Sequence, residues 1–291
     1  MKALSNAIWA VYPADSEPFE LARLDRETGE RTASIPLSGA IPDDAKHIAI
    51  GFGSVWVVSG HRVVHRVDLE TARVVARIEL SHHLGGIAID ASAVWVSSDF
   101  SGGCLFRVDP RTNTATIVAS PANPRELAAI SGDLWISHGS RVTRLDTNTM
   151  RPSVTHDLGG FVLELRAGDG AVWAATLEET PITDAGETGL VFRLSADRAV
   201  PFARIDGRAA GLAFGLGAVW IAASKLQRID VTDGATKVID EQVVMPTVVG
   251  SALWASRISY TGGDDELVRI DPSGEVTVLA RGELPSALAS E

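Results

Sequence analysis

The stretch Gly51-Phe52-Gly53-Ser54-Val55-Trp56 decides the fold of this 291-residue chain, because its last two residues, an apolar residue followed by tryptophan, recur along the whole sequence. Each tryptophan follows an apolar residue, and the seven pairs are Ile8-Trp9, Val55-Trp56, Val94-Trp95, Leu134-Trp135, Val172-Trp173, Val219-Trp220 and Leu253-Trp254. A second marker, arginine-apolar-aspartate, follows six of the pairs, as Arg23 to Asp25, Arg66 to Asp68, Arg107 to Asp109, Arg144 to Asp146, Arg228 to Asp230 and Arg269 to Asp271. After the fifth tryptophan this marker reads Arg193-Leu194-Ser195. The chain is therefore a sevenfold internal repeat.

The period of the repeat and its short alternating apolar runs predict an all-β fold. Units of about 40 residues built only from short alternating apolar runs are typical of a β-propeller, with one four-stranded blade per unit. Within residues 47–80 we expect strands at 47–50, 55–59, 63–68 and 74–80, running from the inside of the blade to its outside. Seven such units use the whole chain, so the sequence predicts one domain over residues 1–291. That domain is a seven-bladed β-propeller with four-stranded antiparallel blades around a central channel.

The repeat also predicts how the blades pack and close. Side chains alternate along a strand, so Val55 and Val57 should face one neighbouring blade while Trp56 fills the wedge toward the other. The aspartate of each marker ends the third strand, where its carboxylate can accept hydrogen bonds from turn amides. Segment 285–289 resembles the start of an inner strand, and we expect this C-terminal tail to pair into blade one.

Composition limits the partners. The 26 basic and 37 acidic residues give a net charge of -11, which repels phosphate backbones and anionic lipid. We therefore expect no nucleic-acid partner, and no membrane partner either, because no apolar stretch approaches the roughly 20 residues of a membrane helix. The N-terminus has no apolar run typical of a signal peptide, so we expect a cytoplasmic protein, and a monomer. Cys104 is the single cysteine, and we interpret it as a small buried residue.

The face that carries the loops between second and third strands is the candidate functional face. These loops range from very short at 223–225 to long at 177–189 and 258–266. Five of the seven histidines map to this face, namely His47, His61, His82, His83 and His138.

Departures from the repeat on that face mark the candidate site. Nine residues before the tryptophan, at the mouth of the channel, stand His47, Gly86, Glu126, Glu164 and Gly211, with Thr247 near this slot in blade seven and Ala287 in it in blade one. Two residues deeper, Arg166 replaces the alanine found as Ala49, Ala88, Ala128 and Ala213. Three residues after the tryptophan stand Tyr12, Ser59, Ser98, His138, Thr176, Ala223 and Arg257. The outliers in these slots predict a ring of functional side chains around one mouth.

This ring could perform acid–base chemistry. Glu126, Glu164 or His47 would act as base, His138 or Tyr12 as acid, and Arg166 and Arg257 would hold an enolate or carboxylate. His61, Asp99, Lys225 and Tyr260 complete the substrate-binding candidates at the rim. The histidines and glutamates could instead hold a divalent metal. A structural alternative is an ion pair of Arg166 with Glu126 and Glu164 that plugs the channel, with hydrogen-bonded rim positions for His47 and His138.

The unit Gly-x-Gly-x-Val-Trp followed by Arg-apolar-Asp-x-x-Thr, as at 51–56, 168–173 and 215–220, resembles the YVTN-type repeat and the virginiamycin B (streptogramin) lyase-like propellers. The resemblance covers essentially the whole chain. It implies seven blades and a magnesium-assisted elimination that opens a cyclic depsipeptide, with histidine and glutamate at the top of the channel. His47, Glu126, Glu164 and His138 match that pattern in residue type, although no glutamate occupies the third position after any tryptophan.

Two classes of function remain open at this point. The first is an enzyme of the lyase, cyclase or isomerase type that acts on a secondary-metabolite-like small molecule at the channel mouth, with Mg²⁺ as the candidate cofactor. The alternative is a non-catalytic propeller that binds a ligand or a protein at its rim. A metal held by His47 and the two glutamates would favour the enzyme, and an Arg166 salt bridge filling the space would favour the scaffold.

Overall fold

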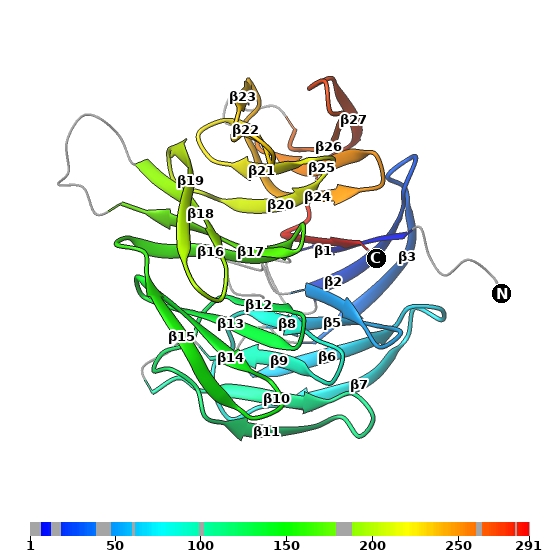
Figure 1. Ribbon diagram of the computed structural model, residues 1–291. Helices are drawn as coiled ribbons and strands as arrows, with labels where there is room; N and C mark the ends of the chain where they lie inside the picture. The colour runs from blue at the N-terminus through cyan, green and yellow to red at the C-terminus, as the bar shows by residue number, and fades with distance from the viewer. Residues whose placement is uncertain are drawn as a thin grey trace.

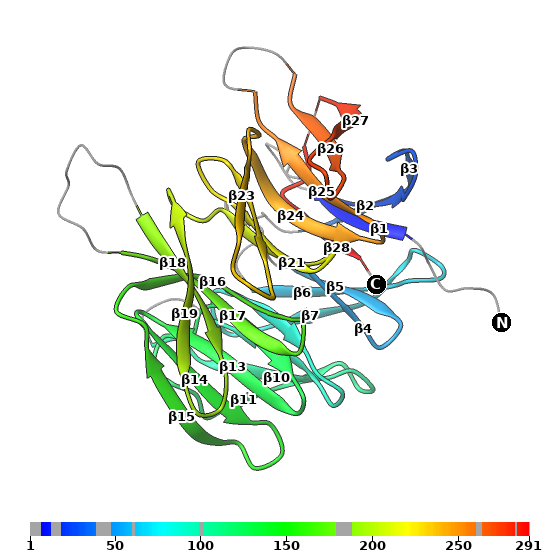
Figure 2. The same ribbon diagram turned by 45° about the horizontal axis from the view of Figure 1, so that its top comes forward.

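The computed structural model describes residues 7–12, 19–38, 48–59, 62–98, 102–178, 188–259, 264–282 and 284–290. These residues form seven four-stranded antiparallel sheets, which stand as blades around a common axis (Figure 1). The fold is a seven-bladed β-propeller, as the repeat predicts. Figure 2 shows the ring tilted, with outer strands such as β15 and β27 at its periphery. No helix within the described ranges is long and apolar enough to cross a membrane.

Each blade contains four strands, which follow one another from the axis outward. Blade one is β28 (Ala287–Ser290), β1 (Ala7–Tyr12), β2 (Phe19–Asp25) and β3 (Arg31–Leu37); blade two is β4 (Ile48–Gly51), β5 (Ser54–Ser59), β6 (Val63–Asp68) and β7 (Val74–Glu79); blade three is β8 (Ile87–Ile89), β9 (Val94–Ser97), β10 (Leu105–Asp109) and β11 (Thr114–Val118); blade four is β12 (Leu127–Ile130), β13 (Asp133–His138), β14 (Arg141–Asp146) and β15 (Arg151–Asp157). Blade five is β16 (Phe161–Gly168), β17 (Ala171–Leu177), β18 (Thr188–Leu194) and β19 (Ala199–Asp206); blade six is β20 (Gly211–Gly215), β21 (Ala218–Ala222), β22 (Leu226–Asp230) and β23 (Thr236–Ile239); blade seven is β24 (Val243–Val249), β25 (Ala252–Arg257), β26 (Glu266–Ile270) and β27 (Val276–Arg281).

The two ends of the chain close the ring. β28 pairs antiparallel with β1, with Ala289 opposite Trp9 and Ala287 opposite Val11 (Figure 2). This pairing supplies the inner strand of blade one and covers the edge of β1, which would otherwise offer unpaired backbone groups. The C-terminal tail thus takes the position expected from the sequence, and segment 1–4 lies outside the described residues.

The tryptophans pack between blades. Trp56 contacts the apolar cluster that holds Val94 and Val96 of blade three, while Val55 and Val57 on the same strand pack with Trp9 of blade one. The exposed fraction of every tryptophan is 3% or less. Each junction between neighbouring blades has its own apolar cluster of this kind, so the tryptophans build the core that the alternation of side chains predicts.

Each tryptophan also stands opposite the arginine of its own marker. The cross-strand pairs are Trp9 with Arg23, Trp56 with Arg66, Trp95 with Arg107, Trp135 with Arg144, Trp173 with Arg193, Trp220 with Arg228 and Trp254 with Arg269. In four of these pairs the guanidinium lies over the indole ring, at 4.9 Å for Arg66 and 5.9 Å for Arg107. The arginine therefore covers the ring with its charged group, a cation–π contact that the sequence pattern did not reveal.

The aspartate of the marker caps the turn between third and fourth strands. Asp25 accepts hydrogen bonds from the backbone amides of Thr28 (2.8 Å) and Glu27 (2.9 Å), and these bonds hold the pKa of its carboxyl below the usual range. The other marker aspartates also accept turn amides. In blade five Ser195 replaces the aspartate, and its hydroxyl contacts the backbone of Arg198 instead.

His65 lies buried at the junction of blades one and two. Its Nε2 is 2.9 Å from the carbonyl oxygen of Ser38, which belongs to the segment after β3. Burial lowers the pKa of His65 and outweighs the opposing effect of the Ser38 hydrogen bond. The folded protein therefore keeps this imidazole neutral at pH values where the unfolded chain takes up a proton.

We expect the free energy of unfolding to fall as the pH drops below about 6.5, the ordinary histidine pKa. Below that pH His65 binds a proton in the unfolded chain but stays neutral in the folded protein, so protonation stabilises the unfolded state. His65→Gln should remove part of this pH dependence, so that the free energy of unfolding falls less between pH 7 and pH 5 than in the wild type. Urea unfolding at several pH values measures it.

The control is Ser59→Ala, which removes a hydroxyl near the same Ser38 carbonyl without removing a titratable group. An unchanged pH slope in His65→Gln would contradict the prediction.

A second prediction concerns the wedge packing. Trp220→Ala should lower the free energy of unfolding by about 3–5 kcal/mol, because the cavity left at the junction of blades six and seven cannot close. Phe52→Ala removes an aromatic ring that is 37% exposed, and should change stability by less than about 0.5 kcal/mol. Equal losses in the two variants, measured by urea unfolding, would contradict the assignment of the tryptophans to the core.

Candidate functional site

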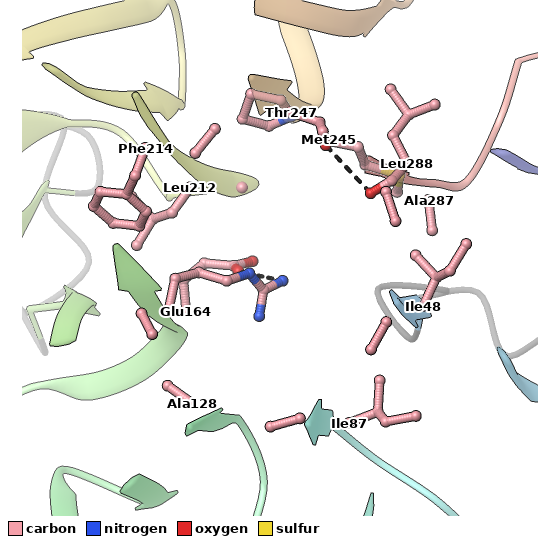
Figure 3. Close-up of a pocket in the computed structure, with 18 of the residues that line it drawn as sticks. Ile48, Ile87, Ala128, Glu164, Leu212, Phe214, Met245, Thr247, Ala287 and Leu288 are labelled. Atoms are coloured by element: carbon pink, nitrogen blue, oxygen red, sulfur yellow. Dashed lines mark hydrogen bonds and ion pairs between the residues drawn. The ribbon is translucent and has the colours of Figure 1, made fainter. Parts of the chain in front are cut away.

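A cavity of about 420 Å³ lies at the axis of the propeller, and residues of all seven inner strands line it. Figure 3 shows Glu164 on one side of this cavity, with Ile48 and Ile87 across from it. Ile50, Ile89 and Leu127 extend the aliphatic wall. The cavity therefore has one charged side and one apolar side. Sequence reasoning missed this wall, whose signal was the apolar alternation of the inner strands.

The inner residue opposite each tryptophan is small in five blades. These residues are Ala289, Ala49, Ala88, Ala128 and Ala213, and the exceptions are Arg166 opposite Trp173 and Thr247 opposite Trp254. The sequence interpretation placed Thr247 near the slot nine residues before the tryptophan. The structure places it seven residues before Trp254, at the position of the alanines, and the bulge between Val244 and Thr247 shifts the register of the residues that precede it. There the Thr247 hydroxyl donates to the carbonyl oxygen of Leu288 at 3.2 Å (Figure 3).

The next ring of the channel concentrates its carboxylates in one sector. A Cβ on Gly86 would lie 2.7 Å from the Arg125 carbonyl oxygen, and one on Gly211 would lie 2.5 Å from Cδ of Pro246. Backbone and ring atoms thus exclude side chains at these two glycines. Ala287 takes the slot expected of it, opposite Val11. The acidic side chains of this ring among the described residues are Glu126 and Glu164, from blades four and five, while His47 lies outside the described residues.

Arg166 joins these two carboxylates. Its Nη1 is 3.3 Å from Oε2 of Glu126, and its Nη2 is 3.2 Å from Oε2 of Glu164. Desolvation opposes the guanidinium charge, but Glu164 and then Glu126 outweigh it and raise the pKa of Arg166. Three residues that the sequence singled out thus form one ion-paired cluster.

The salt bridge does not fill the channel. The Glu164 side chain is fully buried, but the side chain of Arg166 remains 32% exposed and that of Glu126 12% exposed. The guanidinium therefore holds both carboxylates and still reaches the open space of the cavity. The predicted ion pair is present, but it does not plug the channel.

Four other predicted site residues lie away from this cluster. Tyr12 is buried under the guanidinium of Arg31, 3.8 Å from the ring centroid. His138 Nε2 lies 2.8 Å from the Thr143 hydroxyl, and burial, together with Arg141, lowers the pKa of His138.

The remaining two are engaged at the rim. Arg257 forms ion pairs with Glu241 and Glu266, whose side-chain hydrogen bonds raise its pKa. Lys225 pairs with Asp240 at 2.8 Å. None of these four residues lines the axial cavity. Their positions lie at or beyond the end of the second strand, and the inner strand separates that strand from the axis. His61, Asp99 and Tyr260 lie outside the described residues.

The described part of the cluster does not fit a divalent metal, and His47, the third predicted ligand, lies outside the described residues. Across the described ranges, no group of three histidine, cysteine, aspartate or glutamate side chains could hold an ion. The carboxylates of Glu126 and Glu164 are instead bridged by a guanidinium, whose charge repels a second cation.

Comparisons with known proteins agree on the fold. No protein-family model and no curated protein matches the chain. Solved structures do match it. Hydrazine synthase of Kuenenia stuttgartiensis has a TM-score of 0.65 at 14% identity, over 90% of this chain and 89% of that one. These likenesses identify the architecture alone.

Two further structures span different kinds of protein. The dihydro-heme d1 dehydrogenase NirN, in complex with DHE, has a TM-score of 0.64 at 15% identity, over 98% of this chain and 75% of that one. The β-propeller domain of Cps50 (Swd1) from Myceliophteria thermophila has a TM-score of 0.65 at 10% identity, over 86% and 93%. Both proteins named as enzymes and a propeller domain not named as one thus share this fold. The likeness to the lyase-like family rests on the sequence motifs alone.

The cluster yields a testable coupling. Arg166→Ala should lower the free energy of unfolding by about 3 kcal/mol, because it leaves the buried Glu164 without its cation. The double variant Arg166→Ala/Glu164→Ala should recover a large part of this loss. Arg141→Ala, which breaks a solvent-exposed pair with Asp157, should cost less than about 1 kcal/mol. Additive effects of Arg166→Ala and Glu164→Ala in urea unfolding would contradict the coupling.

Proposed function

We propose that this propeller binds a small molecule in the axial cavity, with the polar part of the ligand on the Glu126–Arg166–Glu164 cluster. The observation that carries the proposal is the retained exposure of Arg166 in a cavity of about 420 Å³, a volume within the range of small-molecule sites.

The two sides of the cavity suggest the class of ligand. The guanidinium of Arg166, which lines the cavity, donates hydrogen bonds. The carboxylate of Glu126 lies behind it, outside the lining, and would accept hydrogen bonds from a ligand group that reaches past Arg166. A neutral group with both an acceptor and a donor, such as an amide or a hydroxyl next to a carbonyl, satisfies both. The aliphatic wall of Ile48, Ile87 and Leu127 favours an apolar body on the same molecule. A secondary-metabolite-like compound has this combination.

A second candidate is acid–base catalysis of the lyase, cyclase or isomerase type. The contact of Glu126 with Arg166 favours it, because a carboxylate base beside a guanidinium can remove a proton while the cation stabilises the resulting oxyanion. His138 and Tyr12 lie away from the cluster, so Glu126 would return the proton to another atom of the substrate itself. That single-base route is an isomerisation rather than an elimination that needs a separate acid.

The test is equilibrium dialysis of the protein against a library of neutral metabolites, with retained compounds identified by mass spectrometry. Wild-type protein should retain compounds that Arg166→Ala loses and that Glu126→Gln binds at least about tenfold more weakly, a loss of about 1.4 kcal/mol. Arg141→Ala, on the surface of blade four, should bind like wild type.

Deuterium exchange separates the two candidates. If retained compounds acquire deuterium from D₂O with wild type but not with Glu126→Gln, the isomerase candidate stands; binding without exchange supports the non-catalytic one. The proposal fails if wild type retains nothing, or if Arg166→Ala and Glu126→Gln retain the same compounds equally well.

A further inference from the structure

The fifth repeat is the one whose marker is broken, and a cavity lies beside that break. Ser195 stands where the other six copies have aspartate. A cavity of about 510 Å³ is lined there by residues of blades four and five, which neighbour each other in Figure 1. We call this cavity the blade four–five groove, and its polar lining comprises Ser131, Asp133, Arg144, Arg193, Ser195 and Arg198.

The marker arginine beside the groove stays within its own blade. In blade two, Arg66 reaches across to blade three and donates to the carbonyl oxygen of Pro110 (2.5 Å) and to Oδ1 of Asn113 (3.0 Å). Arg144 is the equivalent residue of blade four, but its guanidinium forms an ion pair with Asp133 of its own blade at 2.7 Å. No described residue of blade five receives a hydrogen bond from Arg144, and the cavity beside the Ser195 turn is not bridged by this side chain.

The charged side chains that line the groove are mostly positive, although the chain as a whole is acidic. Three arginines and one aspartate line the groove, in a protein with a net charge of -11. Asp133 is engaged by Arg144, and Arg193 lacks the carboxylate of its own marker because Ser195 replaces it. Among the described residues, neither Arg193 nor Arg198 has a carboxylate within ion-pair distance. Asp169 and Asp197 are exposed, as Arg193 and Arg198 are, but the two aspartates lie outside the lining of the groove.

The rest of the lining is apolar and well supported. Trp135, Phe202 and Val200 contribute to it, and Val200 is 40% exposed. The ring of His156 stacks on Trp135 at an interplanar angle of 11°, and its Nε2 lies 3.0 Å from the carbonyl oxygen of Ser195. This contact fixes the Ser195 turn against blade four.

From this combination we infer that the blade four–five groove binds a small organic anion, a carboxylate or phosphate carried on a ring or short aliphatic chain. Guanidinium groups recognise such oxyanions through paired hydrogen bonds. Arg193 and Arg198 supply these donors, and Val200 and Phe202 cover the apolar part. The site is independent of the axial cavity and of the function proposed for it.

Isothermal titration at fixed ionic strength tests the inference with phenyl phosphate, benzoate and inorganic phosphate as probes. Wild type should bind phenyl phosphate or benzoate saturably, and inorganic phosphate more weakly because it has no apolar part. Comparison of the first two probes shows whether phosphate or carboxylate is preferred.

The other six repeats indicate which substitutions test the groove. Ser195→Asp restores the carboxylate that the other six markers carry, so the fold should tolerate it while the anion binds at least about tenfold more weakly. Arg198→Ser should weaken binding similarly. The matched control is Arg73→Ser, because Arg73 precedes the fourth strand of blade two as Arg198 does in blade five, beside an intact Asp68.

Three results would overturn the inference: no saturable binding of either organic probe to wild type, equal binding to wild type and Ser195→Asp, or loss of binding in Arg166→Ala. The last result would place the anion in the axial cavity. Tryptophan fluorescence of each variant verifies that the blades remain packed.

Discussion

The whole structure depends on the packing of one tryptophan per blade into the wedge between that blade and the next. In five blades the tryptophan lies between an alanine on the inner strand and the arginine of its marker on the third strand, as Trp56 lies between Ala49 and Arg66. An alanine on the inner strand leaves room for the channel. The widening outer space is filled by the indole and then by the long arginine side chain.

This constraint explains why a single large residue in the inner slot has functional meaning. Arg166 replaces the usual alanine, and its side chain lines the channel. A lone guanidinium in that environment would be costly, and Glu126 and Glu164 neutralise it from two adjacent blades. The glycines at 86 and 211 cannot contribute side chains, because neighbouring inner strands come too close. The polar sector therefore belongs to blades four and five.

The same two blades carry the other irregular feature, the broken marker at Ser195. In intact copies the aspartate caps its turn, and in blade two the arginine crosses to blade three. In blade four Arg144 forms an ion pair with Asp133 of the same blade. In blade five Ser195 replaces the aspartate that ends the third strand. The turn beside this junction therefore lacks the carboxylate that the other six markers carry.

The sequence by itself determined the number of blades, their strand order, the closure by the C-terminal tail and the joint appearance of Glu126, Glu164 and Arg166. These follow from local spacing, because residues in register along a repeat occupy equivalent places in every blade. Only the tertiary structure decided which outliers meet. Tyr12, His138 and Arg257 share a sequence slot that suggests the channel mouth. Each instead contacts a partner in its own blade, namely Arg31, Thr143 and Glu266 respectively. The reason is physical: a repeat fixes the position of a backbone, whereas the direction of a long polar side chain is set by the nearest partner in space, which sequence spacing does not show.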